Sequence, residues 1–148
     1  MFPIIGAHVL GMYALVLVVG TVIDRIGRQV ALAVGLLVMA ASTLGLLWIE
    51  GVAATAVLLF GLGVGWNLSF VAATAQLVDA TAPSERGRLL GFNDLVSALL
   101  GAALALVGGY ALDSIGVAAL AIGATALVVA PALWLAPRWA TRPVREPW

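Results

Sequence analysis

A few polar or amphipathic side chains interrupt the long apolar stretches of this sequence, and they are the residues best placed to do chemistry. The candidates are Trp66, Asn67, Gln76 and Asp94. A carboxylate at the centre of a bilayer costs about 3 kcal/mol, so such groups face protein or water rather than lipid. Asp94 is therefore predicted either to act as a proton-linked group or to pair with Arg86 or Arg88.

Asn67 and Asp94 also have structural interpretations. Asn67 follows the glycine-rich stretch 61–65, where it would hold two closely packed helices together through one interhelical hydrogen bond. Asn93 and Asp94 would cap the helix that follows if they lie in an interfacial loop. His8 is expected to be a packed or interfacial histidine rather than a proton relay. The residues alone leave these alternatives open.

Two polar clusters follow apolar stretches and carry arginine. The first contains Gly20, Asp24, Arg25, Gly27 and Arg28, and the second contains Glu85, Arg86 and Arg88. A carboxylate at the end of a helix can accept hydrogen bonds from the N-terminal amides of a neighbouring helix or pair with arginine. The arginines can bind lipid phosphates or hold adjacent loops. The plain alternative is a basic turn between two helices.

Composition decides which elements position these residues. The chain has 148 residues, of which 64% are hydrophobic and 9% charged, well outside the range of soluble domains. A membrane helix needs about 20 apolar residues, and lipid-exposed backbone must satisfy its own hydrogen bonds. The sequence predicts an all-α membrane bundle over residues 1–137 and a short basic tail over 138–148. The predicted spans are 2–23, 30–49, 52–78, 89–112 and 114–137.

The arginines predict the orientation of these spans. All seven basic residues are arginines, and they follow only the first, third and fifth spans, whereas Glu50 and Asp113 occupy the other turns. Cytoplasmic loops carry the excess of basic residues in membrane proteins. The predicted topology therefore has the N-terminus outside and the C-terminus in the cytoplasm. This orientation leads us to expect that further helices precede the chain.

Several functions are disfavoured by what the sequence lacks. The formal net charge is zero, so no nucleic-acid partner is implied. The chain has no cysteine and a single histidine, so we expect neither a metal site nor a cofactor. It has no Gly-x-Ser-x-Gly and no His-Glu-x-x-His motif, so we expect no enzymatic activity.

The first cluster reads Gly20-x-x-x-Asp24-Arg25-x-Gly27-Arg28 and resembles the cytoplasmic loop motif of the major facilitator superfamily. The stretch 61–67 is similar to a tenth helix of bacterial members, and 83–94 is similar to their entry into the eleventh. Gln29 departs from the motif, which commonly has a basic residue there. The resemblance implies that the five spans correspond to helices eight to twelve of a twelve-helix transporter.

The resemblance implies a partial secondary active transporter of a small solute, in the cytoplasmic membrane of a bacterium. It also implies that Trp66, Asn67, Gln76 and Asp94 line the path of the solute. Such a binding site lies between two halves near the bilayer midplane, so we expect no transport by this chain alone. The expected partners are the lipid bilayer, the solute, and a missing N-terminal half or a second copy of the chain. The alternative is a small membrane interaction protein or subunit that pairs with itself or with a separate N-terminal half.

Overall fold

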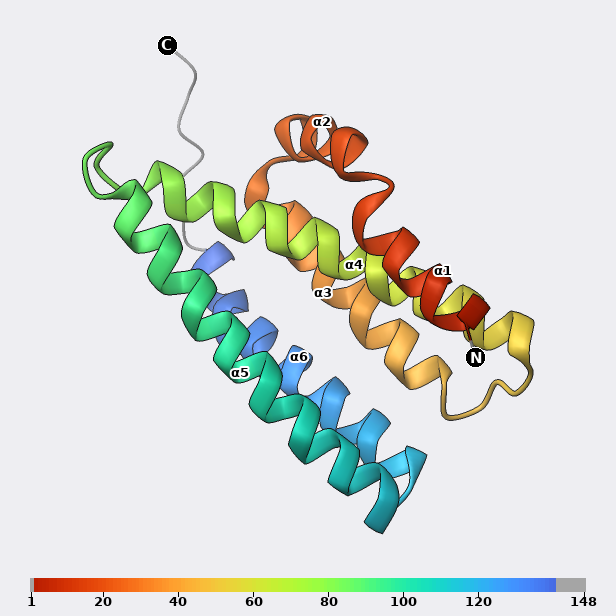
Figure 1. The fold of residues 1–148 in the computed structure, drawn as a ribbon. Coiled ribbons are helices and arrows are strands. Elements are labelled where there is room, and N and C mark those ends of the chain that lie inside the picture. The colour runs from red at the N-terminus through yellow and green to blue at the C-terminus, as the bar shows by residue number, and fades with distance from the viewer. Residues whose placement is uncertain (1, 141–148) are drawn as a thin grey trace.

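A computed structural model describes residues 2–140, and this part of the chain is entirely helical apart from short turns (Figure 1). The helices are α1 (Phe2–Tyr13), α2 (Val16–Ile26), α3 (Arg28–Gly45), α4 (Val52–Asp79), α5 (Arg86–Ser114) and α6 (Val117–Ala140). The prediction of an all-α bundle is confirmed.

Within the described residues, three helices are individually long and apolar enough to cross a membrane, namely α3, α4 and α5. The bent pair of α1 and α2 makes a fourth candidate span if it is counted as one. α6 contributes a shorter apolar helical segment, Val117–Pro131, which is not among these candidates. The five predicted span boundaries and the orientation stay predictions, and residues 141–148 of the predicted tail lie outside the described part.

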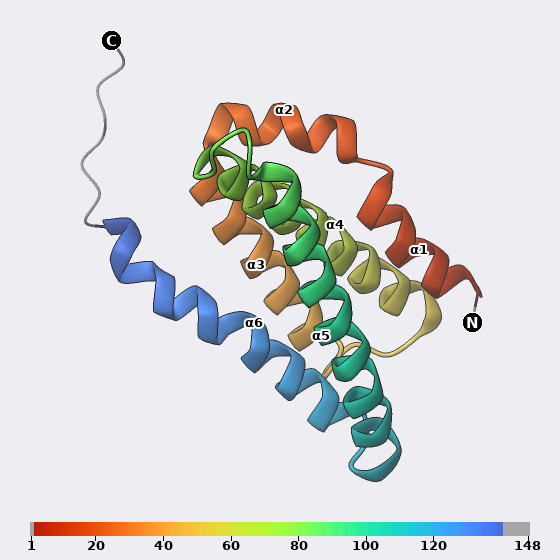
Figure 2. The ribbon, with the colours of Figure 1, turned by 60° about the vertical axis from the view of Figure 1, so that its left-hand side comes forward.

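The first predicted span, 2–23, is broken rather than continuous. α1 ends at Tyr13, α2 begins at Val16, and the two helices are bent by 50°. A helix bends sharply where a side chain enters its hydrogen-bond ladder, and the side-chain amide of Asn67 donates to the carbonyl of Met12 at 2.5 Å. Both views show α2 turned away from the direction of α1 (Figures 1 and 2).

Glycine contacts hold α4 between α1 and α3 (Figure 2). A Cβ on Gly63 would run into the carbonyl oxygen of His8 in α1, and a Cβ on Gly65 would lie 2.7 Å from the carbonyl oxygen of Gly35 in α3. Small residues at such positions let helix backbones approach closely in a membrane, where dispersion and polar contacts drive association. The glycines of α4 thus make it the central helix of this group.

α5 and α6 form an antiparallel hairpin whose helices lie closest at their turn and diverge toward the other end (Figure 2). No residue of α5 is buried, and its apolar side chains are exposed along its length. α6 instead packs on α3, where the hydroxyls of Thr43 and Thr125 are 2.8 Å apart. An apolar face of this extent on a membrane helix suits contact with lipid or with further helices.

Candidate solute site beside α4

Asn67 is the most buried large side chain of the described chain, with 1% of its surface exposed. Its Nδ2 donates to the carbonyl of Met12, which lies in the last turn of α1, where helical carbonyls have no partner within their own helix. Its Oδ1 is buried and finds no hydrogen-bond partner among residues 2–140. The amide therefore closes the end of α1 and keeps one buried acceptor free.

Trp66 begins a row of aromatic side chains on the neighbouring face of α4. The rings of Trp66 and Phe70 are stacked, with centroids 4.9 Å apart and planes 8° apart. Tyr13, at the end of α1, meets Trp66 edge-on with centroids 6.4 Å apart. Residues four apart on a helix are neighbours on its surface, which is why Trp66 and Phe70 meet. The row leads from the break between α1 and α2 along α4.

A cavity of about 330 Å³ lies at the other end of this row, between α4 and α5. Its lining residues are Phe70, Ala73, Thr74 and Leu77 from α4, and Asn93 and Ser97 from α5. No charged side chain is among them. Thr74, Asn93 and Ser97 carry hydroxyl or amide groups that make no side-chain hydrogen bond within the described part of the chain. The lining of the cavity thus includes one aromatic residue and three polar groups without side-chain hydrogen bonds.

The predicted path residues are brought together only in part. Trp66 continues the aromatic row that reaches the cavity, and Asn67 lies at the break between α1 and α2. Gln76 is half-buried, and its Nε2 has no partner among the described residues. Asp94 is exposed and does not line the cavity, although its neighbour Asn93 does.

Asp94 also lies well inside a helix. Because α5 begins at Arg86, neither Asn93 nor Asp94 caps its N-terminus, so the capping interpretation is wrong. No ion pair joins Asp94 to Arg86 or Arg88 in the described structure. Phe70 and Asn93 were not among the predicted path residues. The spacing of 70, 74 and 77, and of 93 and 97, is the sequence signal for the two walls of the cavity.

Arg28 of the first polar cluster contacts the end of α4. Its guanidinium forms an ion pair with Asp79, and its Nη1 donates to the carbonyl of Ala75 at 3.2 Å. Asp24 and Arg25 are exposed, and neither forms an ion pair within the described residues. The carboxylate that meets an arginine is therefore Asp79 rather than Asp24.

The other members of the two clusters have simpler surroundings. Gly27 separates α2 from α3 with φ of 86°, a conformation that glycine adopts without strain, whereas a Cβ on Gly20 would meet no atom within 4 Å. Arg86 donates from Nε to the carbonyls of Val78 and Thr81, each at 3.2 Å. Glu85 and Arg88 are exposed.

Arg28 and Arg86 thus place two guanidinium groups at the same end of α4. A positive charge there is favourable, because the carbonyl end of a helix carries partial negative charge. His8 contacts α4 farther toward its start, where its Nδ1 donates to the carbonyl of Leu59 at 3.0 Å. The histidine is therefore packed between α1 and α4.

These features are typical of a polytopic membrane protein: apolar helices, a buried amide and arginines at one end of α4. The sequence model of the Major Facilitator Superfamily matches residues 4–148. The chain belongs to this superfamily of membrane transporters, which confirms the resemblance. The curated relatives are transporters as well.

Three curated relatives are similar to part of the chain. Riboflavin transporter RfnT of Brucella anthropi is 38% identical over 89 residues, which are 60% of this chain and 22% of that protein. The uncharacterized MFS-type transporters YddS and YdeG of Bacillus subtilis are each 33% identical over 108 residues, or 72% of this chain and 25% of each relative. The matches thus span a quarter or less of the relatives' lengths. No solved structure matches the chain.

Proposed function

We propose that these helices form part of the wall of a secondary transporter that moves a small solute across a bacterial cytoplasmic membrane. The observation that carries this proposal is Asn67, an amide with 1% exposure inside a 28-residue apolar helix, whose Oδ1 has no partner within residues 2–140. A buried polar group without a partner is costly, so its persistence is easiest to understand where a solute or water supplies the partner. Membership of the superfamily supports the proposal that this group faces a solute path.

The transporter would be larger than this chain. The relatives are about four times as long as the segments they share with it. Transporters of this kind bind solute near the bilayer midplane, between structural repeats. We infer that the five predicted spans correspond to helices eight to twelve and supply one wall of that site. We therefore expect no transport by the chain alone.

Roles follow for the predicted residues. Trp66 and Asn67 would face the solute path, Gln76 would extend it along α4, and Asp94 would lie beside its α5 wall. Arg28 and Arg86 would hold the cytoplasmic end of α4, through the contacts described above. The exposed members of the two clusters would be available to lipid phosphates or to the other half of the transporter; they are Asp24, Arg25, Glu85 and Arg88.

Riboflavin is the first solute to test, because the relative RfnT is a riboflavin transporter. Proteoliposomes containing this chain alone are expected to show no saturable riboflavin uptake. A chimera is the positive arm: the segment of RfnT that matches this chain is replaced by the corresponding part of this chain. We expect saturable uptake by the chimera.

Asn67→Ala in the chimera is expected to lower riboflavin uptake about tenfold, which corresponds to about 1.4 kcal/mol of lost interaction. Thr21→Ala is the matched control, because Thr21 is exposed on α2 and makes no side-chain hydrogen bond in the described structure. Saturable uptake by the chain alone would contradict the proposal that this chain supplies only one wall of the solute site. Equal uptake by the Asn67→Ala and Thr21→Ala chimeras would remove Asn67 from the path.

A further inference from the structure

The aromatic row of Tyr13, Trp66 and Phe70 ends at Phe70, which lines the α4–α5 cavity. Trp66 stacks on one face of Phe70, yet Phe70 remains 39% exposed and lines the cavity. Planar π systems prefer to stack with an offset or to meet edge-on. Because Trp66 already orients the Phe70 ring, a second planar group can stack there with little loss of side-chain freedom. Phe70 is therefore a preorganised stacking partner for a ligand in the cavity.

Three polar groups line the same cavity. The hydroxyls of Thr74 and Ser97 can each donate and accept, and the amide of Asn93 can do both at once. Polar groups of this kind fix the orientation of a ligand in a cavity that is otherwise apolar. Ring nitrogens and carbonyls at the edge of a heteroaromatic ring are suitable partners for them. The absence of charged side chains from the lining favours a neutral ligand.

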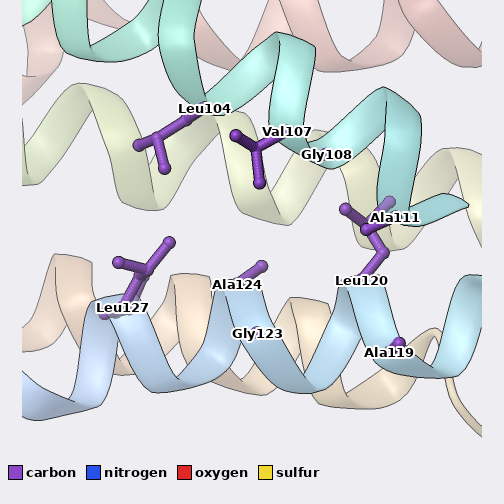
Figure 3. Close-up of a pocket in the computed structure, with 10 residues that line it drawn as sticks. Leu104, Val107, Gly108, Ala111, Ala119, Leu120, Gly123, Ala124 and Leu127 are labelled. Atoms are coloured by element: carbon purple, nitrogen blue, oxygen red, sulfur yellow. The ribbon is translucent and has the colours of Figure 1, made fainter. Parts of the chain in front are cut away.

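A second cavity of similar size lacks the polar groups of the α4–α5 cavity. It has a volume of about 370 Å³ and lies between α5 and α6 (Figure 3). Its labelled side chains are apolar, with Leu104 and Val107 from α5 facing Leu120 and Leu127 from α6. That cavity has no side chain that could bond a polar ring edge. The two cavities are similar in size, so their chemistry distinguishes them.

We propose that the α4–α5 cavity binds a neutral planar heteroaromatic solute, stacked on Phe70 and hydrogen-bonded at its edge by Thr74, Asn93 and Ser97. This inference rests on the proposed transport function, because it names the class of solute for the same path. Phe70 would set the preference for a planar ring. The three polar groups would set which edge atoms are accepted.

Lumichrome, a planar tricyclic compound that is neutral at pH 7, is the probe. The whole chain is placed in lipid nanodiscs, and binding is measured by equilibrium dialysis, with empty nanodiscs subtracted. Phe70→Leu is expected to weaken saturable binding about tenfold, because it removes the stacking surface. Phe70→Tyr keeps the ring and is expected to remain within about twofold of the unmodified chain.

The polar groups are tested by Thr74→Val and Ser97→Ala, each expected to weaken binding about fivefold. Phe92→Leu is the matched control, since Phe92 is an exposed phenylalanine of α5 that does not line the cavity. Ribitol, a flexible polyol that cannot stack, is expected not to displace lumichrome. Far-UV circular dichroism compares the helix content of each variant with that of the unmodified chain.

Three results would overturn the inference: no binding above empty nanodiscs, equal effects of Phe70→Leu and Phe92→Leu, or displacement by ribitol. Transport remains a separate readout. Riboflavin uptake by the chimera together with unchanged lumichrome binding in Phe70→Leu overturns this inference and leaves the transport proposal standing. Lumichrome binding that depends on Phe70, without uptake by the chimera, supports this inference and contradicts the transport proposal.

Discussion

Asn67 combines a structural contact with an unpaired acceptor. Its amide nitrogen bonds the carbonyl of Met12, which α1 leaves without a helical partner, and its amide oxygen stays unpaired in the described structure. The first contact holds the broken span against α4, while the second leaves an acceptor for a solute or water. Both roles of Asn67 that the sequence left open are therefore compatible, because one amide carries a donor and an acceptor.

Asn67→Ala is expected to lower the free energy of unfolding by about 1 kcal/mol, a typical value for a hydrogen bond between membrane helices. The substitution destabilises the chain by removing the bond to Met12 and leaving a small cavity. These losses are larger than the stabilisation gained by removing the unpaired oxygen. The measurement is reversible unfolding in mixed micelles with increasing dodecyl sulfate. Thr21→Ala is again the control, and equal stability of the two variants would show that the Met12 contact contributes nothing.

At the scale of elements, α4 is the helix around which the others are arranged. α1 and α3 pack on it through close backbone contacts at Gly63 and Gly65, and α5 forms the far wall of the cavity. α5 has no buried residue, so its glycines do not serve the same purpose. Gly101 illustrates this, because a Cβ there would meet no atom within 4 Å.

Gly65→Ala is therefore expected to destabilise the chain by about 1 to 3 kcal/mol, as overpacking does. The new methyl group would lie 2.7 Å from the carbonyl oxygen of Gly35 and 3.0 Å from the backbone nitrogen of Met39, and backbone cannot move aside as a flexible side chain can. Gly101→Ala makes the same chemical change in open space and is expected to be neutral or stabilising by up to about 1 kcal/mol.

The same unfolding assay in mixed micelles compares these two variants. A Gly101→Ala variant that loses as much stability as Gly65→Ala would show that helix propensity, rather than backbone contact, governs both positions. Equal stability of Gly65→Ala and the unmodified chain would show that α3 and α4 do not approach closely in the membrane.

At the scale of the whole molecule, the arginines predict the orientation in the bilayer. Arg28 and Arg86 both contact the C-terminal part of α4 or the turn after it, while Glu50 lies in the turn before α4 and Asp113 lies in the last turn of α5. Two arginine-bearing turns thus meet at one end of α4, which matches the predicted clustering of basic residues on one side. The rule that basic loops stay cytoplasmic predicts that this is the inner end.

Labelling of single cysteines tests this orientation directly, because the natural chain has none. We expect Glu50→Cys and Asp113→Cys to react with a membrane-impermeant maleimide in intact cells, and Arg88→Cys to react only after the cells are opened. Labelling of all three sites in opened cells is the control for reactivity. Reaction of Arg88→Cys in intact cells, or protection of Glu50→Cys there, would contradict the predicted orientation.

The sequence predicted the class and the family because both depend on local patterns. Apolar stretches long enough to span a bilayer predict helices wherever they occur, and residues 20–28 carry a compact loop motif. The amide of Asn67 was a candidate because any polar group in such a stretch must face protein or water. The full extent of the cavity was not predictable, because Phe70 and Asn93 belong to different helices and meet only after folding.

The sequence by itself thus determined an all-helical membrane chain of the major facilitator type. Only the tertiary structure decided that the first span is broken after Tyr13, that Arg28 meets Asp79, and that the aromatic row ends at a polar cavity. The physical reason is the range of the interactions. Hydrophobic length and helix formation act between neighbours in the chain, whereas the Asn67–Met12 bond and the α4–α5 cavity join residues whose proximity depends on how the helices pack.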